Sequence, residues 1–194
     1  MTAADDPPDA DLVARALSGE DVAFTQLMRR HKADLFRFAR RYTGDPDAAL
    51  DVVQDSFVSA WKALDRYDGR YPFGVWLRAI ALNKCRDRGR RLFLRRLVLG
   101  QADPDGHEAQ SSPDPSPDAE ASLISRERRA ALDKALAALP PGLKEPLILT
   151  VFDGYSQQEA GAMLGMSAKA IEVRVYRARR RLAEILGPEV SDAD

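Results

Sequence analysis

The chain has 194 residues and a formal net charge of −1, which allows one large or two small domains and excludes a general polycation. Its single cysteine, Cys85, excludes an internal disulfide and a cysteine-cluster metal site and fits a reducing compartment. His31 and His107 are too isolated for a metal site or a catalytic triad, so we expect no cofactor and no metal. No apolar run is long enough to cross a membrane, and the acidic N-terminus is unlike a signal peptide, which predicts a soluble, cytoplasmic protein with no membrane insertion of its own.

The first half of the chain predicts a disordered tail and four helices. Residues 1–10 are small, acidic and proline-bearing, which is typical of a disordered tail. A helix is expected from Asp11 to the Ser18-Gly19 stop, and a second runs from Asp21 to the stop-and-restart signal at residues 43–46. The third and fourth are expected over about 46–64 and 73–91. The apolar runs at 92–94 and 97–99 either continue the fourth helix or fold back onto the domain.

The third helix carries two different faces. One face is apolar and suits a core, and the other is polar with two large apolar residues beside it. The apolar face contains Ala49, Val52, Val53, Phe57, Ala60 and Leu64. The polar face contains Asp51, Gln54, Asp55 and Ser59, with Val58 and Trp61 nearby.

Residues 66–91 interleave aromatic and basic side chains. Such a mixture is typical of single-strand binding, because an unpaired base stacks on an aromatic or guanidinium plane for about 1–3 kcal/mol. Phe73 and Trp76 stand at helical spacing, where core packing is the commoner role, while Tyr67 and Tyr71 lie in a loop and are better candidates for exposure.

Charge is segregated along the chain in spite of the near-zero total. Arg78 to Arg96 carries eight basic residues against Asp87 alone, as expected of local nucleic-acid contacts. Leu99 to Ser125 carries six acidic residues and no basic one. Residues 99–122 are rich in Pro, Ser and Asp and lack periodicity, so they are predicted to form a flexible acidic linker.

The second half predicts further helices over about 123–139 and 143–152, separated by the Pro140-Pro141-Gly142 break. Ser156 and Glu159 then form a capping-box pattern that starts another helix, and Gly165 suits the left-handed end of that helix. Ser167 is a cap for a last helix, whose expected buried stripe is Ile171, Val175, Ala178, Leu182 and Ile185.

The last two helices favour a helix-turn-helix. The final helix carries basic residues off its buried stripe: Lys169, Arg174, Arg177, Arg180 and Arg181. A basic second helix after a short first helix and a glycine turn suits a DNA major groove. An ordinary helical hairpin with a solvated basic face is the alternative from this stretch alone. The chain as a whole is predicted to be all-α, with two small helical domains at 11–98 and 123–187, the acidic linker between them and a short tail at 188–194.

Two groups of motifs resemble one known family. The segment from Asp51 to Phe57, Trp61 and the segment 72–87 are similar to region 2 of bacterial RNA polymerase sigma factors of the extracytoplasmic-function class. The segments 139–141, 155–159 and 175–179 resemble region 4 of the same class, which keeps only these two regions. The order of the two matches along the chain is the expected one.

The resemblance implies three sets of contact residues and no catalytic residue. Docking on the β′ clamp helices of the polymerase is implied for Asp51, Gln54, Asp55, Phe57 and Trp61. Melting and recognition of the −10 promoter element is implied for Arg70, Tyr71, Phe73, Trp76, Arg78, Asn83, Lys84, Arg86 and Arg90. Recognition of the −35 element is implied for Ser167, Lys169, Arg174, Arg177, Arg180 and Arg181. The implied partners are core RNA polymerase, through β′ and the β flap, promoter DNA and an anti-sigma factor.

Three functional hypotheses remain, and the first explains most of the chain. A promoter-recognition subunit accounts for both domains and for the linker between them. A stand-alone helix-turn-helix repressor or activator leaves the aromatic and basic first domain without a role. An enzyme has least support, because no convergent Ser/His/Asp set, phosphate-binding glycine loop or metal cluster occurs in the sequence.

Overall fold

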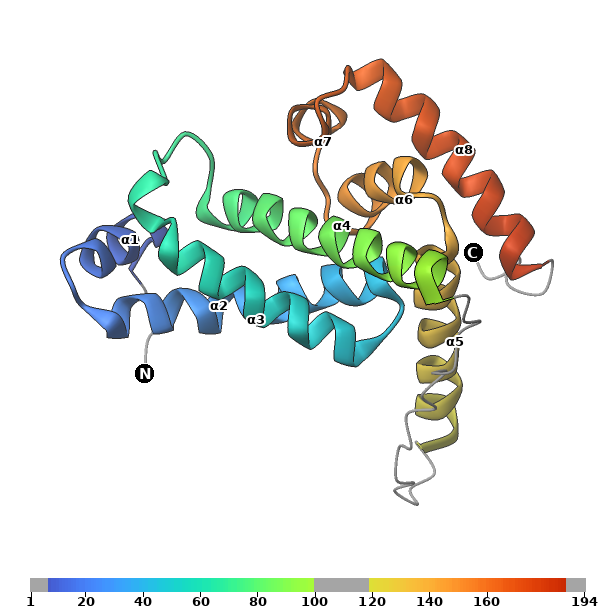
Figure 1. The fold of residues 1–194 in the computed structure, drawn as a ribbon, viewed down its shortest axis with the longest axis horizontal. Coiled ribbons are helices and arrows are strands. Elements are labelled where there is room, and N and C mark those ends of the chain that lie inside the picture. Colours follow the sequence, from blue (N-terminus) through green and yellow to red (C-terminus); the bar gives the residue numbers. More distant parts are fainter. Residues whose placement is uncertain (1–6, 100–118, 188–194) are drawn as a thin grey trace. The chain divides into compact units, whose positions relative to one another are not determined.

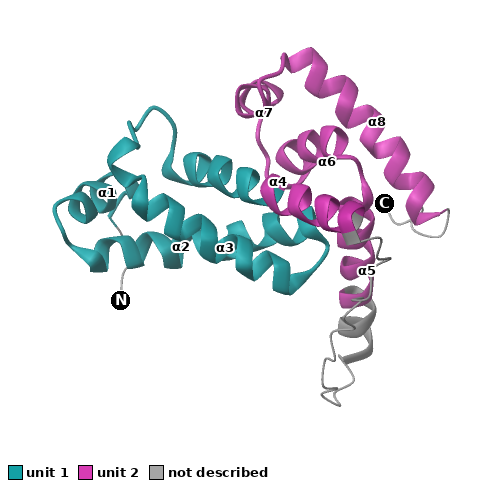
Figure 2. Ribbon diagram, viewed as in Figure 1, with its two compact units in different colours: residues 1–85 teal, residues 86–194 magenta. Residues whose placement is uncertain are grey.

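The computed structural model describes residues 7–99 and 119–187, and within these ranges every regular element is a helix (Figure 1). The chain forms two compact units, residues 1–85 and 86–194 (Figure 2). The division falls inside α4 (Phe73–Leu99), upstream of the predicted domain end at residue 98. Most of the predicted linker, residues 100–118, and the tail from residue 188 lie outside the described residues. The predicted all-α fold is confirmed.

The first unit contains α1 (Asp9–Leu17), α2 (Asp21–Thr43), α3 (Pro46–Lys62), the 3-10 turn η1 (Leu64–Arg66) and the first part of α4. The predicted stop and restart after α2 is confirmed. Gly44 ends α2 in the left-handed conformation at φ 75°, and its N–H donates to the Arg40 carbonyl. The Asp45 carboxylate then accepts from the N–H groups of Asp47 and Ala48, which caps α3 with Pro46 in its first turn.

The core of the first unit lies where α1, α2, α3 and α4 bring their apolar faces together. The six apolar residues predicted for the core on the third helix are all buried. The largest fully buried side chains of this unit are Leu12, Leu27, Phe38, Phe73 and Leu77. Burial of this kind stabilises by about 1.5–3 kcal/mol per large apolar side chain relative to exposure.

Two boundaries in the first unit differ from those predicted. Helix α1 already starts at Asp9, inside the segment expected to be a disordered tail, because the Asp9 side chain has partners on α2 that a local pattern does not reveal. Helix α4 continues to Leu99. The apolar runs at 92–94 and 97–99 therefore extend the helix, and Phe93, Leu97 and Val98 are exposed on it.

The second unit contains the rest of α4, then α5 (Ala119–Ala138), α6 (Pro141–Leu147), the π-helical turn η2 (Ile148–Phe152), α7 (Gln157–Leu164) and α8 (Ala168–Leu186). Helix α6 starts at Pro141 rather than at 143, because proline fits the first helical position, where its missing N–H costs nothing. A core of Leu136, Leu139, Leu147 and Ala178 joins α5, α6 and α8. None of the helices described is long and apolar enough to cross a membrane.

Candidate nucleic-acid interface

The predicted helix-turn-helix is formed by α7 and α8. Ser156 Oγ accepts from the Glu159 N–H at 3.2 Å, and the Ser156 N–H donates to Glu159 Oε2 at 2.8 Å, so both halves of the capping box are present. The Ser156 hydroxyl also donates to Glu159 Oε2 at 2.8 Å, and this hydrogen bond, followed by the one from the Ser156 N–H, lowers the pKa of the Glu159 carboxyl. The Ser167 hydroxyl caps α8 by accepting from the Ala170 N–H at 3.2 Å.

Two glycines allow the turn between these helices. Gly165 takes the left-handed conformation at φ 68°, which side chains resist. At Gly161 the obstacle is space, since a Cβ there would lie 2.6 Å from the Met166 carbonyl oxygen. The backbone of the turn therefore packs directly on α7.

Helix α8 presents one face to its unit and the other to solvent. Ile171 and Ala178 are fully buried, Val175 and Leu182 are half-buried, and the expected fifth member of the stripe, Ile185, is 40% exposed. The prediction that Ile185 is buried is therefore wrong, because this residue lies near the end of the helix, beyond the core of the unit. Four predicted −35 contacts are exposed on α8: Lys169, Arg177, Arg180 and Arg181.

The structure separates Arg174 from the other predicted −35 contacts. Its Nη1 donates to the Gly142 carbonyl at 3.1 Å, so this half-buried guanidinium ties α8 to α6. Conversely, Tyr176 is 63% exposed and Val173 is 39% exposed, and neither was among the predicted contacts. Val173 is four residues from Lys169 and from Arg177, and Tyr176 is four residues from Arg180. This helical spacing places both on the face of the exposed cations, and it is the sequence signal that could have identified them.

The predicted −10 contacts lie on a loop and on α4. The loop consists of residues 67–72, between η1 and α4, and is called the 67–72 loop below. At its tip the Arg70 side chain is 81% exposed with its Nε 3.0 Å from Asp68 Oδ2, and Tyr71 is 56% exposed. On α4, Asn83 is exposed and Lys84 is half-buried. These four side chains are accessible to a ligand.

Two residues predicted to contact the −10 element are buried, and we exclude them from the candidate site. Phe73 is 0% exposed and packs its ring against Tyr67 and His31. Arg78 is 9% exposed, lies over the Phe38 ring at 4.8 Å and donates to the Asp34 carbonyl at 3.1 Å. Both face the core because α4 must pack on α2.

Three further predicted −10 residues are engaged with other side chains. Trp76 is half-buried, with its ring centroid 5.2 Å from that of Tyr67. Within the second unit, Arg86 binds both carboxylate oxygens of Glu145, at 2.8 and 2.6 Å, and the Glu145 side chain is only 4% exposed. Arg90 forms an exposed ion pair with Asp87. An exposed pair of this kind is weak, so Arg90 can exchange its partner for a phosphate.

The outer face of α3 carries the predicted polymerase contacts. Asp51, Gln54 and Asp55 are exposed, and Trp61 is 43% exposed. Trp61 also packs edge-on against Phe24 at 4.8 Å, which fixes its ring. The exposed apolar residues Leu50 and Val58 lie on the same helix, and the sequence interpretation did not include them in the site.

Phe57 is the correction on α3. It was predicted both as a core residue and as a docking residue, and the structure leaves only the first role, because it is 3% exposed and meets the Phe24 ring edge-on at 6.5 Å. A buried ring cannot contact another protein without a rearrangement of the core.

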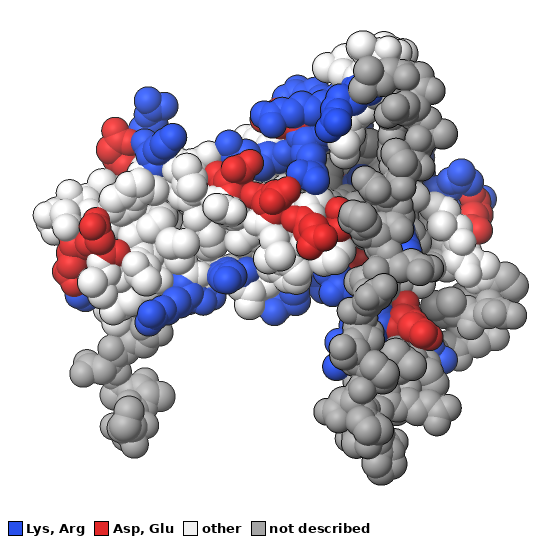
Figure 3. Space-filling model, turned by 60° about the horizontal axis from the view of Figure 1, so that its bottom comes forward, with Lys and Arg blue, Asp and Glu red and all other residues white. Residues whose placement is uncertain are grey.

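The predicted acidic segment 99–125 lies mostly outside the described residues, and charges of both signs occur on the described surface. Figure 3 shows a band of Asp and Glu side chains on the face drawn, with several groups of Lys and Arg side chains around it. Among the residues described, no group of His, Cys, Asp and Glu is placed to hold a metal ion. The accessible side chains of α8 and of the 67–72 loop carry guanidinium, ammonium and aromatic groups, which suit nucleic-acid binding.

Comparison with known sequences gives matches to both halves of the chain. The family model of sigma-70 region 2 matches residues 27–93, and that of sigma-70 region 4 matches residues 129–182. The RNA polymerase sigma factor CnrH of Cupriavidus metallidurans is 42% identical over 188 residues, which cover 93% of this chain and 96% of CnrH. The ECF RNA polymerase sigma factor SigM of Mycobacterium tuberculosis is 33% identical over 181 residues, which cover 92% of this chain and 85% of SigM.

Two solved structures resemble the chain as well. CnrH in complex with the cytosolic domain of CnrY superposes with a TM-score of 0.66 at 36% identity and covers 92% of this chain and 96% of that one. The sigma factor RpoE of Bartonella quintana, in complex with the anti-sigma factor NepR, gives a TM-score of 0.67 at 26% identity and covers 86% of this chain and 98% of that one.

Proposed function

The chain belongs to the extracytoplasmic-function class of RNA polymerase sigma factors, and from this premise we propose that it directs core polymerase to promoters through three separate surfaces. The observation that carries the proposal is the exposed basic face of α8 in the same chain as the aromatic and basic 67–72 loop. A member of this family is an initiation factor rather than a catalyst. Its work is in the cytoplasm, where the polymerase is.

The first surface is the outer face of α8, which we assign to the −35 element. Arg177 and Arg180 point away from the buried stripe, with Lys169 about two to three turns earlier and Tyr176 beside them. Arginine reads guanine in the major groove through two hydrogen bonds, and a good pair of this kind discriminates by about 1–3 kcal/mol. Arg174, bound to Gly142, supports the helix instead of reading bases.

The second surface is the 67–72 loop with the adjoining part of α4, which we assign to the −10 element. Tyr71 offers an exposed ring and Arg70 an exposed guanidinium, and Asn83 and Lys84 follow on α4. Removing a base from the duplex costs a few kcal/mol, which stacking on one or two such groups and phosphate contacts can offset.

The third surface is the outer face of α3, which we assign to core polymerase. Its carboxylates, Asp51 and Asp55, border the exposed apolar residues Leu50, Val58 and Trp61 along one side, and the Gln54 amide lies among them. An apolar centre with a polar rim is the usual anatomy of a protein interface.

Run-off transcription tests the function as a whole. The purified chain is added to core polymerase on a pool of genomic promoter fragments, with core polymerase alone as control. We expect transcripts from a small set of promoters that share two spaced elements. If the folded chain supports no transcript yet binds duplex DNA by itself, the stand-alone repressor or activator hypothesis replaces the sigma factor.

The double variant Asp51→Ala with Gln54→Ala tests the docking surface. Both side chains are exposed, so we expect an unchanged unfolding midpoint and a loss of association with core polymerase in co-purification. Glu184→Ala, which removes an exposed carboxylate from α8, is the control and is expected to leave that association unchanged. Co-purification of the double variant at the wild-type level contradicts the assignment of α3.

We also propose that an anti-sigma factor controls the chain. Two related sigma factors were solved with protein partners, CnrH with the cytosolic domain of CnrY and RpoE with the anti-sigma factor NepR. The exposed apolar residues Phe93, Leu97 and Val98 of α4 give such a partner a surface to cover. A genomic library from the source organism can be screened for a product that silences a reporter driven by this chain. That product is expected to bind the wild-type chain and to bind a Phe93→Asp variant more weakly.

A further inference from the structure

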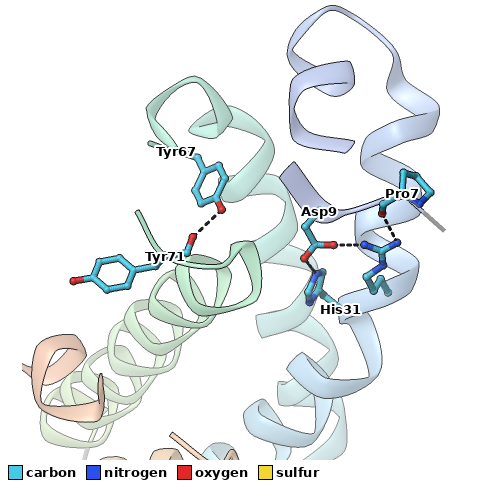
Figure 4. A network of polar contacts seen from close by, with 6 residues as sticks. Pro7, Asp9, His31, Tyr67 and Tyr71 are labelled. Atoms are coloured by element: carbon cyan, nitrogen blue, oxygen red, sulfur yellow. Dashed lines mark hydrogen bonds and ion pairs between the residues drawn. The ribbon is translucent and has the colours of Figure 1, made fainter. Parts of the chain in front are cut away.

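Asp9 fixes the start of α1 to the middle of α2. Its carboxylate accepts from the Arg30 guanidinium and lies 2.7 Å from His31 Nε2, and Arg30 also donates to the Pro7 carbonyl at 2.9 Å (Figure 4). The side chains of Asp9, Arg30 and His31 are only 23%, 28% and 18% exposed. Partly buried, charge-assisted contacts with two donors on one carboxylate hold their geometry better than exposed pairs do.

The opposite side of the His31 ring lies against the first turn of α4. Its centroid is 5.4 Å from that of Phe73. Gly74 permits this approach, because a Cβ at that position would lie 3.2 Å from both Cε1 and Nδ1 of His31. His31 thus connects Asp9 on one side with the start of α4 on the other.

Phe73 in turn belongs to an aromatic cluster that holds both ends of the 67–72 loop. Its ring centroid lies 5.8 Å from Tyr67 and 5.6 Å from Trp76. Tyr67 Oη donates to the Tyr71 carbonyl at 2.7 Å, which closes the loop (Figure 4). Burial, and then the charges of Asp9 and Asp68, raise the pKa of Tyr67, so its hydroxyl stays protonated and continues to donate.

Helix α1 supports the other end of the loop as well. It packs against η1, the turn that leads directly into residue 67. Both stems of the loop are therefore held from the side of α1, one through η1 and the other through His31 and Phe73. The tip, with Arg70 and Tyr71, stays exposed between them.

We infer that Asp9 and His31 are positioning residues for the 67–72 loop, which hold it in the shape that presents Tyr71 and Arg70 to an unpaired promoter base. The inference rests on the proposed −10 function of the loop. It assigns a role to α1, which lies outside the region 2 match at residues 27–93. A capture site works only when its supporting contacts are fixed, since small misplacements of the contacting groups remove most of the binding.

The test compares two aspartates of the first turn of α1. Asp9→Ala removes the carboxylate that binds Arg30 and His31, and Asp11→Ala removes an exposed carboxylate from the same turn, with the same change in charge. Full-length chain is assembled with core polymerase, and the probe is a single-stranded oligonucleotide that carries the non-template −10 sequence of a responsive promoter. Fluorescence anisotropy then gives the affinity of each holoenzyme for the probe.

We expect Asp9→Ala and His31→Ala to weaken probe binding roughly tenfold, with Asp11→Ala within about twofold of wild type. Affinity for core polymerase and for a −35 duplex stays unchanged, which a general loss of structure would not allow. The double variant of Asp9 and His31 is expected to be no weaker than either single one, because the two residues act through one another. His31→Gln, which keeps an N–H donor for Asp9, restores part of the affinity.

Three outcomes decide the matter. Probe binding by Asp9→Ala at the level of Asp11→Ala overturns the inference. A parallel loss of affinity for core polymerase also overturns the inference, because Asp9 then contributes to general stability and not to the shape of the loop. If Asp9→Ala does not fold, Asp9→Asn, which is nearly identical in shape, is compared with Asp11→Ala instead. Tyr71→Ala separates the inference from its premise, since unchanged probe binding by that variant would reject the proposed function of the loop itself.

Discussion

The candidate DNA contacts on α8 stand on the outer face of a regular helix, whereas those around the 67–72 loop alternate with side chains that hold the first unit together. On α8 the buried stripe and the exposed cations separate cleanly, with Arg174 as the residue that turns back to the protein. In the loop and α4, neighbouring residues have opposite roles, since Tyr71 is 56% exposed and Phe73 is fully buried.

The difference follows from the function proposed for each region. A helix that reads an intact duplex needs only a rigid, exposed row of side chains. A loop that captures an unpaired base needs a fixed shape without the regular hydrogen bonds of a helix, so its support comes from side chains such as Phe73, Tyr67 and His31. Aromatic residues near such a loop are therefore divided between contact and support.

Phe73→Ala is expected to have the largest effect on stability. It empties a fully buried position and is expected to lower the free energy of unfolding of the first unit by about 3–5 kcal/mol. Urea denaturation followed by circular dichroism measures the change. Tyr71→Ala, two residues earlier and exposed, is the matched control, with an expected change within about 0.5 kcal/mol. Equal losses in the two variants would remove the distinction between contact and support in this region.

Arg177→Ala tests the exposed face of α8, where loss of a side chain is expected to weaken DNA binding and to leave the stability of the fold unchanged. If Arg177 pairs with a base edge, promoter affinity falls by about 1–3 kcal/mol and discrimination at that base is relaxed. If it contacts a phosphate, the loss is smaller and the salt dependence of binding falls by about one counterion. Holoenzyme binding to a −35 duplex at several salt concentrations separates the two cases.

Arg179→Ala is the control for that measurement. Arg179 is exposed on the same helix but lies to one side of the face that carries Lys169, Arg177 and Arg180. Its removal changes the charge equally and is expected to change affinity less, with no altered base preference. A loss equal to that of Arg177→Ala would mean that α8 attracts DNA by charge alone.

The sequence predicted the region of α7 and α8 better than the region of the 67–72 loop and its supports, for physical reasons. The cap of α7, the left-handed Gly165 and the buried stripe of α8 are all encoded within a few residues, and local patterns report them. The contact between Asp9 and His31 joins residues 22 apart in sequence, and no local pattern indicates it. Phe57 and Arg78 were predicted to contact a partner or DNA but are buried. The cause is similar, since helical spacing shows which residues share a face of a helix but not which neighbouring element covers that face.

A substitution in the capping box of α7 is expected to have the smallest effect, and it tests how much this cap stabilises the fold. Ser156→Ala removes the hydroxyl that accepts from the Glu159 N–H and is expected to cost about 1 kcal/mol of stability. Because hydrogen bonds from Ser156 lower the pKa of Glu159 below its ordinary value of 4.5, the ionised carboxylate stabilises the fold above that pH. This contribution is lost as the pH falls through the lower pKa of the folded state. The difference in melting temperature between wild type and Ser156→Ala should therefore stay near its value at pH 7 down to about pH 4.5 and shrink below that pH, and a difference that stays constant below pH 4.5 would show that the hydrogen bond from the Ser156 hydroxyl to Glu159 Oε2 contributes nothing.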